Sequence, residues 1–227
     1  MGKIVLTFDQ DWVPDPYSDS IINTLRERNI KSTWFITHRS KILDKLRKYD
    51  NLFELGIHPN FLPGTTHGST ENEILLNMMN LVPEAKLIRT HSVYQSGPLI
   101  SKITEFSNIK YDSSIFLPNM PGIVPILHHT PHRVLKRFPI FWADDHELVK
   151  KKKSWDLPQT LKSDGLKIFL FHPIHIVYNS DSLDHYRKCK DNDGVISYKE
   201  EGVRSFFTKL VDFITSSKHE TSFIDQL

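Results

Sequence analysis

Short apolar runs alternate with amphipathic stretches through the first third of the chain. Residues 3–8, 31–36 and 52–57 are mostly apolar or β-branched, which predicts three strands. Between them, apolar residues recur every three or four positions around 21–25 and 42–46, which predicts two amphipathic helices. Helices that alternate with strands in this way are typical of βα units, so we expect a sheet of mainly parallel strands.

Helix caps and later apolar runs define the remaining predicted elements. Ser18 or Asp19 is expected to cap the first helix, and Ser69 or Thr70 forms a capping box with Glu73 ahead of a third helix. No linker or repeat divides the chain, which predicts one domain over the whole length. Further predicted elements are strands over residues 86–89, 166–171 and 222–224 and helices over 98–106 and 199–216, whereas residues 117–139 show no clear pattern.

The composition is that of a folded protein with balanced charge. Of the 227 residues, 39% are hydrophobic and 25% are charged, and the net charge of +2 gives no reason to expect a nucleic-acid partner. The run Lys150–Lys153 is locally basic, and a solvated helix end accounts for it. The chain begins with too short an apolar stretch for a signal peptide and has no run long enough to span a membrane, so we expect a cytoplasmic protein.

Carboxylates and histidines recur at the carboxyl ends of the predicted strands. In a barrel of parallel strands these ends share one face, where such folds assemble their active sites. Two carboxylates two positions apart on an extended backbone point to the same side and repel each other unless a cation or a shared proton compensates. Together with the histidines, this pattern favours a metal site. The residues are Asp9 and Asp11 after the first strand, His58 after the third, His91 after the strand over 86–89, and His172 after the strand over 166–171.

The residue types at these positions suit zinc. Neutral imidazoles and a carboxylate leave an open position on Zn²⁺, where a water becomes nucleophilic at neutral pH. His58 stands directly at its strand end, whereas His67 lies nine positions later in a loop and is equally typical of a loop surface. His172 is placed to transfer a proton beside such a water. Arg89 could pair with a carboxylate or cover the rim of the barrel.

Taken in order, these segments resemble the motifs of the polysaccharide deacetylase family, the NodB-homology group of carbohydrate esterases. The resemblance is closest to a WbmS-like branch that reads T-F-D-x-D-W, G-x-H-P-N-F and F-H-P-I-H. Each motif alone is short, but the ordered set spans the chain. The matching segments are Thr7-Phe8-Asp9-Gln10-Asp11-Trp12, His58 with His67, Arg89-Thr90-His91-Ser92, Trp142-Ala143-Asp144-Asp145 and Leu170-Phe171-His172.

The resemblance implies a distorted, incompletely closed (β/α) barrel with a divalent metal. Two departures keep alternatives open. One residue separates the two early carboxylates where the family has them adjacent, so either could bind the metal. The two loop histidines are not spaced i, i+4, so His91 or His175 could replace the second of them. Carried over by position, the roles are general base for Asp9, metal ligand for Asp11, His58 and His67, partner of the base for Arg89, and general acid for His172.

The resemblance further implies a metal-dependent carbohydrate de-N-acetylase, with Zn²⁺ as the expected metal. We expect it to act in bacterial surface-polysaccharide biosynthesis, on an N-acetylated sugar linked to a nucleotide or lipid carrier. Trp12 and Trp142 are expected to pack on the sugar ring, with His91 and His175 also on the substrate side. Two alternatives remain: an iron enzyme with two histidines and one carboxylate, and a non-catalytic member of the same fold that binds sugar.

Overall fold

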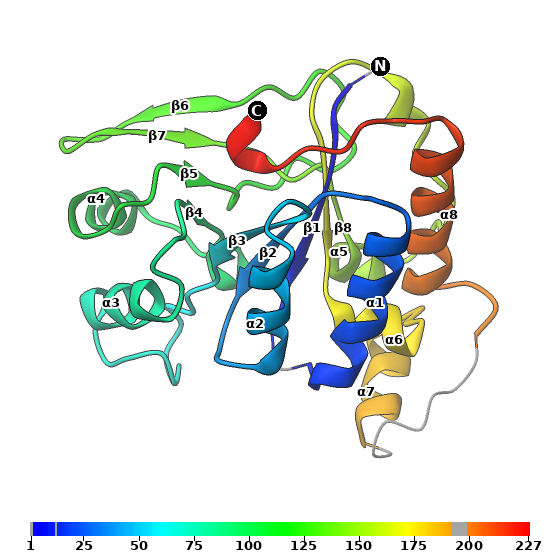
Figure 1. Cartoon of the computed structure of the whole chain (residues 1–227), viewed down its shortest axis with the longest axis horizontal. Helices are drawn as coiled ribbons and strands as arrows, with labels where there is room; N and C mark the ends of the chain where they lie inside the picture. The colour runs from blue at the N-terminus through cyan, green and yellow to red at the C-terminus, as the bar shows by residue number, and fades with distance from the viewer. Residues whose placement is uncertain (1, 12, 192–198) are drawn as a thin grey trace.

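A single curled sheet forms the centre of the protein, as the computed structural model of residues 2–11, 13–191 and 199–227 shows (Figure 1). Its strands are β1 (Ile4–Asp9), β2 (Ser32–Ile36), β3 (Phe53–Ile57), β4 (Leu87–Ile88), β5 (Tyr111–Asp112), β6 (Ile126–His129), β7 (Val134–Arg137), β8 (Trp142–Ala143) and β9 (Lys167–Phe171). The strand order is β6-β7-β5-β4-β3-β2-β1-β9-β8. All neighbours pair in parallel except β6 and β7, which are antiparallel. Because β6 and β8 stand at the two ends of this order, the sheet is an incompletely closed barrel, as predicted.

Helices connect the strands and cover the outside of the sheet (Figure 1). None of those in the described part of the chain combines the length and the apolar character that crossing a membrane requires. The α-helices are α1 (Asp15–Glu27), α2 (Lys41–Lys48), α3 (Glu71–Leu81), α4 (Gly97–Phe106), α5 (Asp144–Val149), α6 (Pro173–Tyr178), α7 (Leu183–Asp191) and α8 (Val203–Ser216), and the 3-10 helices are η1 (His91–Val93), η2 (Gln159–Lys162) and η3 (Ile224–Gln226).

The core lies around the three central strands. All six residues of β1 are buried, and its Phe8 ring stacks on Trp34 of β2 and on Phe171 of β9, with ring centroids 4.5 and 5.8 Å apart. Helix α8 packs Phe206 and Phe207 against β9. Burying a side chain of this size contributes about 1.5–3 kcal/mol. This packing fixes the carboxyl ends of the three strands, from which the candidate site is built.

The predicted strands and helices are largely confirmed, with differences at their ends. Thr70 caps α3 by accepting a hydrogen bond from the Glu73 backbone N–H, as the capping box predicts. Helix α1 begins at Asp15 and not beside Ser18 or Asp19, since a proline in its first turn supplies a preorganised φ. The unassigned stretch over residues 117–139 contains the antiparallel pair β6 and β7.

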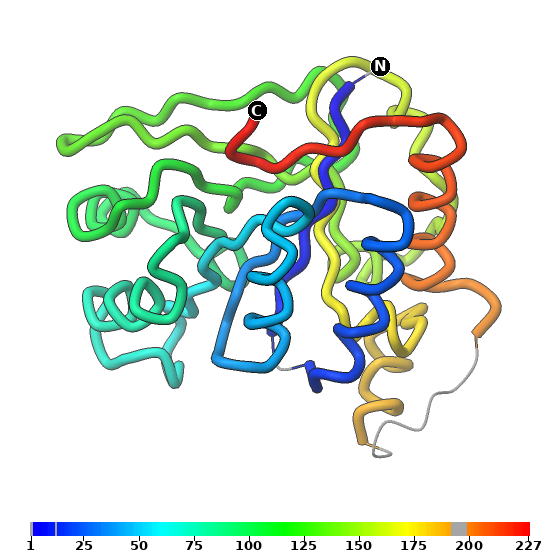
Figure 2. The backbone as a smooth tube through the Cα atoms, viewed as in Figure 1, coloured from blue at the N-terminus to red at the C-terminus, as the bar shows by residue number. Residues whose placement is uncertain are grey.

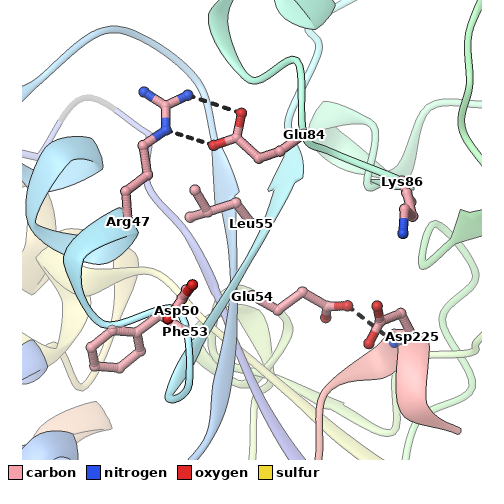
Figure 3. Close-up of a pocket in the computed structure, with 8 residues that line it drawn as sticks. All are labelled: Arg47, Asp50, Phe53, Glu54, Leu55, Glu84, Lys86 and Asp225. Atoms are coloured by element: carbon pink, nitrogen blue, oxygen red, sulfur yellow. Dashed lines mark hydrogen bonds and ion pairs between the residues drawn. The ribbon is translucent and has the colours of Figure 1, made fainter.

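The end of the chain is not the strand predicted over residues 222–224. It crosses the amino-terminal edge of the sheet, beside the first residues of the chain (Figure 2), with a single bridge between Ile4 and Thr221 and the short helix η3. There Glu54 of β3 accepts hydrogen bonds from the backbone N–H groups of Ile224 and Asp225 at 3.0 and 3.1 Å. Figure 3 shows the pocket around this contact, beside the first residues of β3. The pocket is lined by Arg47, Asp50, Phe53, Glu54, Leu55, Glu84, Lys86 and Asp225.

Candidate active site

Three histidines surround the carboxylate of Asp11 at the carboxyl edge of the sheet. The Oδ1 atom of Asp11 lies 3.6 Å from Nε2 of His58 and 3.6 Å from Nδ1 of His91. Its Oδ2 atom lies 3.6 Å from Nε2 of His172. These residues follow β1, β3, β4 and β9, so the convergence of strand ends expected from the sequence is present.

Asp11 reaches this position by turning away from β1. The strand ends at Asp9, and the backbone N–H of Gln10 still donates to the carbonyl of Phe35 at 3.0 Å. Asp11 then takes a left-handed conformation with φ of 43°, which aspartate tolerates better than most residues. The extended backbone assumed from the sequence is therefore replaced by a turn. Burial alone would raise the pKa of the Asp11 carboxyl, but the His91 contact and the charges of His172 and His58 lower it.

His58 presents an unpaired nitrogen to Asp11. It is buried, and its Nδ1 lies 2.7 Å from the carbonyl oxygen of Arg89, which requires the proton to be on Nδ1. The Nε2 atom is buried and has no hydrogen-bond partner among the described residues. Burial lowers the pKa of His58, so the ring is neutral and Nε2 carries a free lone pair.

His91 lies in a strained turn that begins three residues after the end of β4. Its backbone N–H donates to the carbonyl of Pro59 at 2.9 Å, and the next two residues, Ser92 and Val93, have φ of 56° and 46°. A left-handed valine is rare because its branched side chain crowds the backbone. The contact with Asp11 raises the pKa of His91. The turn thus holds this imidazole against the carboxylate.

His67 lies beside the cluster and contacts the backbone of its own loop. Its Nδ1 accepts a hydrogen bond from the backbone N–H of Asn60 at 3.0 Å, and its carbonyl accepts one from the Asn77 side chain at 2.8 Å. It lines a small cavity together with Asp11 and His91. A neutral imidazole that accepts at Nδ1 carries its proton on Nε2, so in this arrangement neither nitrogen offers a lone pair to the cluster. The contacts of His67 are those that fix the loop over residues 58–68.

The ligand atoms of Asp11, His58 and His91 fit a metal ion. One such atom from each of the three residues lies within 4.8 Å of the other two. A carboxylate and two imidazoles are donors that Zn²⁺ and other divalent transition metals accept, with positions left for water or substrate. The orphaned, buried Nε2 of His58 is the strongest sign of a ligand, since such an atom is costly without a partner. His91, one of the two substitutes considered from the sequence, occupies the third position.

Asp9 forms a buried ion pair with Arg89 on one side of the cluster. One guanidinium nitrogen of Arg89 donates to Oδ1 of Asp9 and to the hydroxyl of Thr7, both at 2.9 Å. The other guanidinium donors bind the carbonyl and hydroxyl oxygens of Ser113. The second carboxylate oxygen of Asp9 lies 3.6 Å from Nε2 of His58. Asp9 therefore keeps one oxygen directed at the cluster.

His172 forms a second buried pair on the other side. Its Nδ1 lies 2.7 Å from Oδ1 of Asp144, and its backbone N–H donates to Oδ2 of Asp144 at 2.6 Å. Burial opposes a charged imidazole, but Asp144, which is fully buried, raises the pKa of His172 well above its usual value. Asp144 belongs to the segment Trp142-Ala143-Asp144-Asp145, but its partnership with His172 is not evident from the sequence. The available signal was the pair of acids, Asp144 and Asp145, that begins two positions after Trp142.

A cavity of about 450 Å³ opens beside these groups. Its polar side carries Asp9, His58, His91 and His172, and its other side is apolar. The apolar lining consists of Val93, Phe116, Ile140, Ala143, Val149, Leu170 and Leu183.

Two residues expected to contact substrate lie elsewhere. Trp142 is buried in the core and stacks on Phe206 with centroids 4.1 Å apart, because successive strand residues face opposite sides and it is Ala143 that faces the cavity. His175 is buried behind His172, where burial lowers its pKa to about 4. Trp12 lies outside the described residues.

Known protein structures share this fold. The chain is 32% identical to a candidate polysaccharide deacetylase involved in O-antigen biosynthesis from Bordetella bronchiseptica, with a TM-score of 0.77 over 93% of this chain and 90% of the other. Two more distant structures show the fold alone. They are the peptidoglycan deacetylase PdaC from Bacillus subtilis (14% identity, TM-score 0.54, 99% and 89% of the two chains) and an acetyl xylan esterase from Clostridium thermocellum in complex with a cobalt ion (12% identity, TM-score 0.50, 99% and 89%). No curated protein matches the chain.

The half-open barrel is the fold that these deacetylase structures share. The model of the WbmS-like polysaccharide deacetylase family matches residues 6–190. The chain belongs to this family.

Proposed function

We propose that the protein is a metal-dependent hydrolase that removes an N-acetyl group from a sugar. The observation that carries the proposal is that a buried charged pair flanks the cluster on each side. The cluster of Asp11, His58 and His91 lies between a carboxylate held by an arginine and an imidazole held by a carboxylate. Amide hydrolysis needs a base on one side and an acid on the other.

The donor atoms of Asp11, His58 and His91 would hold the divalent ion. Bound there, the ion would supply positive charge that activates water and stabilises the developing oxyanion. Zinc suits these donors best among the common hydrolytic metals. The same donors also occur in iron oxygenases, but the paired acid and base favour hydrolysis.

Asp9 and His172 divide the proton transfers. Arg89 holds Oδ1 of Asp9, so that Oδ2 is the oxygen free to take a proton from the attacking water. As the carbon–nitrogen bond breaks, His172 gives the proton on Nε2 to the departing nitrogen, and the products are acetate and a free amine. Each of these transfers typically contributes roughly a hundred- to ten-thousand-fold to the rate.

The substrate is proposed to be a sugar used in bacterial surface-polysaccharide assembly. The description of the Bordetella protein as involved in O-antigen biosynthesis supports this setting. A cavity of about 450 Å³ is in the range for one ligand of small-molecule size. We therefore expect a single terminal sugar to enter it, in preference to a long chain.

Acetate release tests the proposal. The purified protein is treated with chelator, reloaded with Zn²⁺, Co²⁺ or Fe²⁺, and incubated with a panel of N-acetylated sugars and with chitin oligomers. Metal-dependent release of acetate and a free amine from a small sugar is the expected result. Stoichiometric sugar binding without acetate release would instead identify a binding protein, and iron-dependent oxygen consumption would identify an oxygenase.

A further inference from the structure

The only basic side chains among the described residues that line the cavity beside the active site are histidines, and the proposed chemistry occupies His58, His91 and His172. No lysine or arginine is among the described residues that line it. Arg89 lies behind the wall, buried and held by Asp9, Thr7 and Ser113. A phosphate attached to the substrate would therefore have to be bound outside the cavity, at its rim.

A run of four lysines begins at this rim. Val149, the last residue of α5, lines the cavity and is 60% exposed. Lys150–Lys153 follow it directly. Since consecutive Cα atoms are about 3.8 Å apart, the Cα atoms of Lys151 and Lys152 lie at most about 8 and 11 Å from that of Val149. The positive charges are thus tethered to the edge of the cavity.

A buried carboxylate holds this segment as a loop. Glu147 of α5 is 3% exposed, and its Oε2 accepts a hydrogen bond from Nζ of Lys150 at 2.6 Å. Its Oε1 accepts one from the backbone N–H of Ser154 at 3.0 Å. One side chain therefore binds both ends of the run, and residues 151–153 form the exposed apex between them.

The charges at the apex are unsatisfied. Among the described residues, no carboxylate forms an ion pair with Lys151, Lys152 or Lys153, in contrast to Lys150. A solvated helix end would leave such side chains free to spread, whereas the hold of Glu147 keeps three like charges close together. A multivalent anion relieves that repulsion, and lysine is a common phosphate binder.

We propose that Lys151, Lys152 and Lys153 bind the diphosphate of a substrate whose sugar occupies the cavity. The assignment of a sugar to the cavity depends on the proposed function, whereas the assignment of a diphosphate depends on the lysine loop alone. Nucleotide-linked and lipid-linked sugars both carry this group, so the chemistry shared by the two is what the loop recognises.

Calorimetric titration tests the proposal without any need for catalysis. The probes are inorganic pyrophosphate, uridine diphosphate and farnesyl diphosphate. The loop variant K151A/K152A/K153A is compared with wild type and with a matched control, K3A/K110A/K162A. The control removes three exposed lysines at or near the opposite edge of the sheet. We expect the loop variant to bind pyrophosphate at least tenfold more weakly than wild type, with a smaller difference in 0.5 M salt. The control should bind as wild type does.

The three probes identify the source of the diphosphate. Tighter binding of uridine diphosphate than of pyrophosphate indicates a nucleotide carrier, and tighter binding of farnesyl diphosphate indicates a lipid carrier. Equal affinity in wild type and the loop variant overturns the proposal, as does an equal loss in both triple variants, which would reflect net charge alone. If the enzyme releases no acetate from any sugar, the proposed function fails, and these titrations still decide the role of the loop.

Discussion

The two carboxylate oxygens of Asp144 both bind His172: Oδ1 lies 2.7 Å from the ring Nδ1, and Oδ2 lies 2.6 Å from the backbone nitrogen. The double contact fixes the ring plane and directs Nε2 at Asp11, 3.6 Å away. Because a buried anion beside an imidazole favours its protonated form, the same contact raises the pKa of His172. One residue therefore sets both the direction and the acidity of the proposed proton donor.

Replacing Asp144 should weaken this donor. In Asp144→Asn we expect kcat to fall at least tenfold, because the ring loses its orientation and its charged partner. The pKa of His172 should fall, so the alkaline limb of the pH–rate profile should move to lower pH. His172→Gln serves as the comparison, since it removes the donor and should abolish that limb. A profile of Asp144→Asn that is scaled down but not shifted would show that the carboxylate acts on geometry alone.

Metal analysis separates the candidate ligands. Asp11→Ala, His58→Ala and His91→Ala should each lose stoichiometric metal, because each removes one of three clustered donors. His67→Gln should keep it, because His67 binds the loop backbone. The measurement is metal content after dialysis, with circular dichroism as the check on folding. Loss of metal in His67→Gln together with retention in His91→Ala would show that His67, and not His91, is the third ligand.

Asp9 is predicted to act on the proton and not on the metal. Asp9→Asn retains an oxygen that can accept from Arg89, so the fold and the metal content should be preserved. Turnover should fall by roughly a hundredfold or more, the typical contribution of a general base. Kinetics and metal content are measured on the same sample. If the variant loses its metal, Asp9 is a ligand and the roles of the two early carboxylates must be exchanged.

The parts of the fold that could be predicted from sequence are those governed by local pattern. Strands such as β1 and β9 are continuous apolar runs, and the residues at their ends are fixed by that boundary, so Asp9 and His172 could be placed at one edge. Two-residue strands such as β8 carry too little pattern to be recognised. The alternation of side chains along β8 directs Trp142 into the core. Because β8 could not be recognised from sequence, neither could this orientation.

The third position of the cluster depended on conformation that the sequence does not display. Ser92 and Val93 adopt left-handed backbone that neither residue favours, and only the surrounding contacts hold them there. That turn brings His91 to Asp11. In the same way, the Asn60 contact that orients His67 arises from the fold of its loop. Spacing along the chain could therefore identify His67 and His91 as candidates for the third ligand, but it could not decide between them.

Far from the active site, Glu54 is predicted to make stability depend on pH. Burial, together with the charge of Asp225, raises the pKa of Glu54 to about 7, although Thr33 and two backbone N–H groups bind its carboxylate. In the unfolded chain this group titrates near 4.5. The folded protein therefore holds the extra proton between these values, and the free energy of unfolding falls as pH rises from about 4.5 to 7.

Glu54→Gln isolates this effect, because the amide stays neutral throughout. Relative to wild type, the variant should gain stability as pH rises from 5 to 7, by at most about 3 kcal/mol, and the difference should level off about one pH unit above the folded-state pKa. Denaturant unfolding at several pH values measures it, with exposed Glu27→Gln as the control. A difference between Glu54→Gln and wild type that does not change over this range would mean that Glu54 is ionised in the folded protein. The backbone N–H groups of Ile224 and Asp225 would then stabilise its carboxylate.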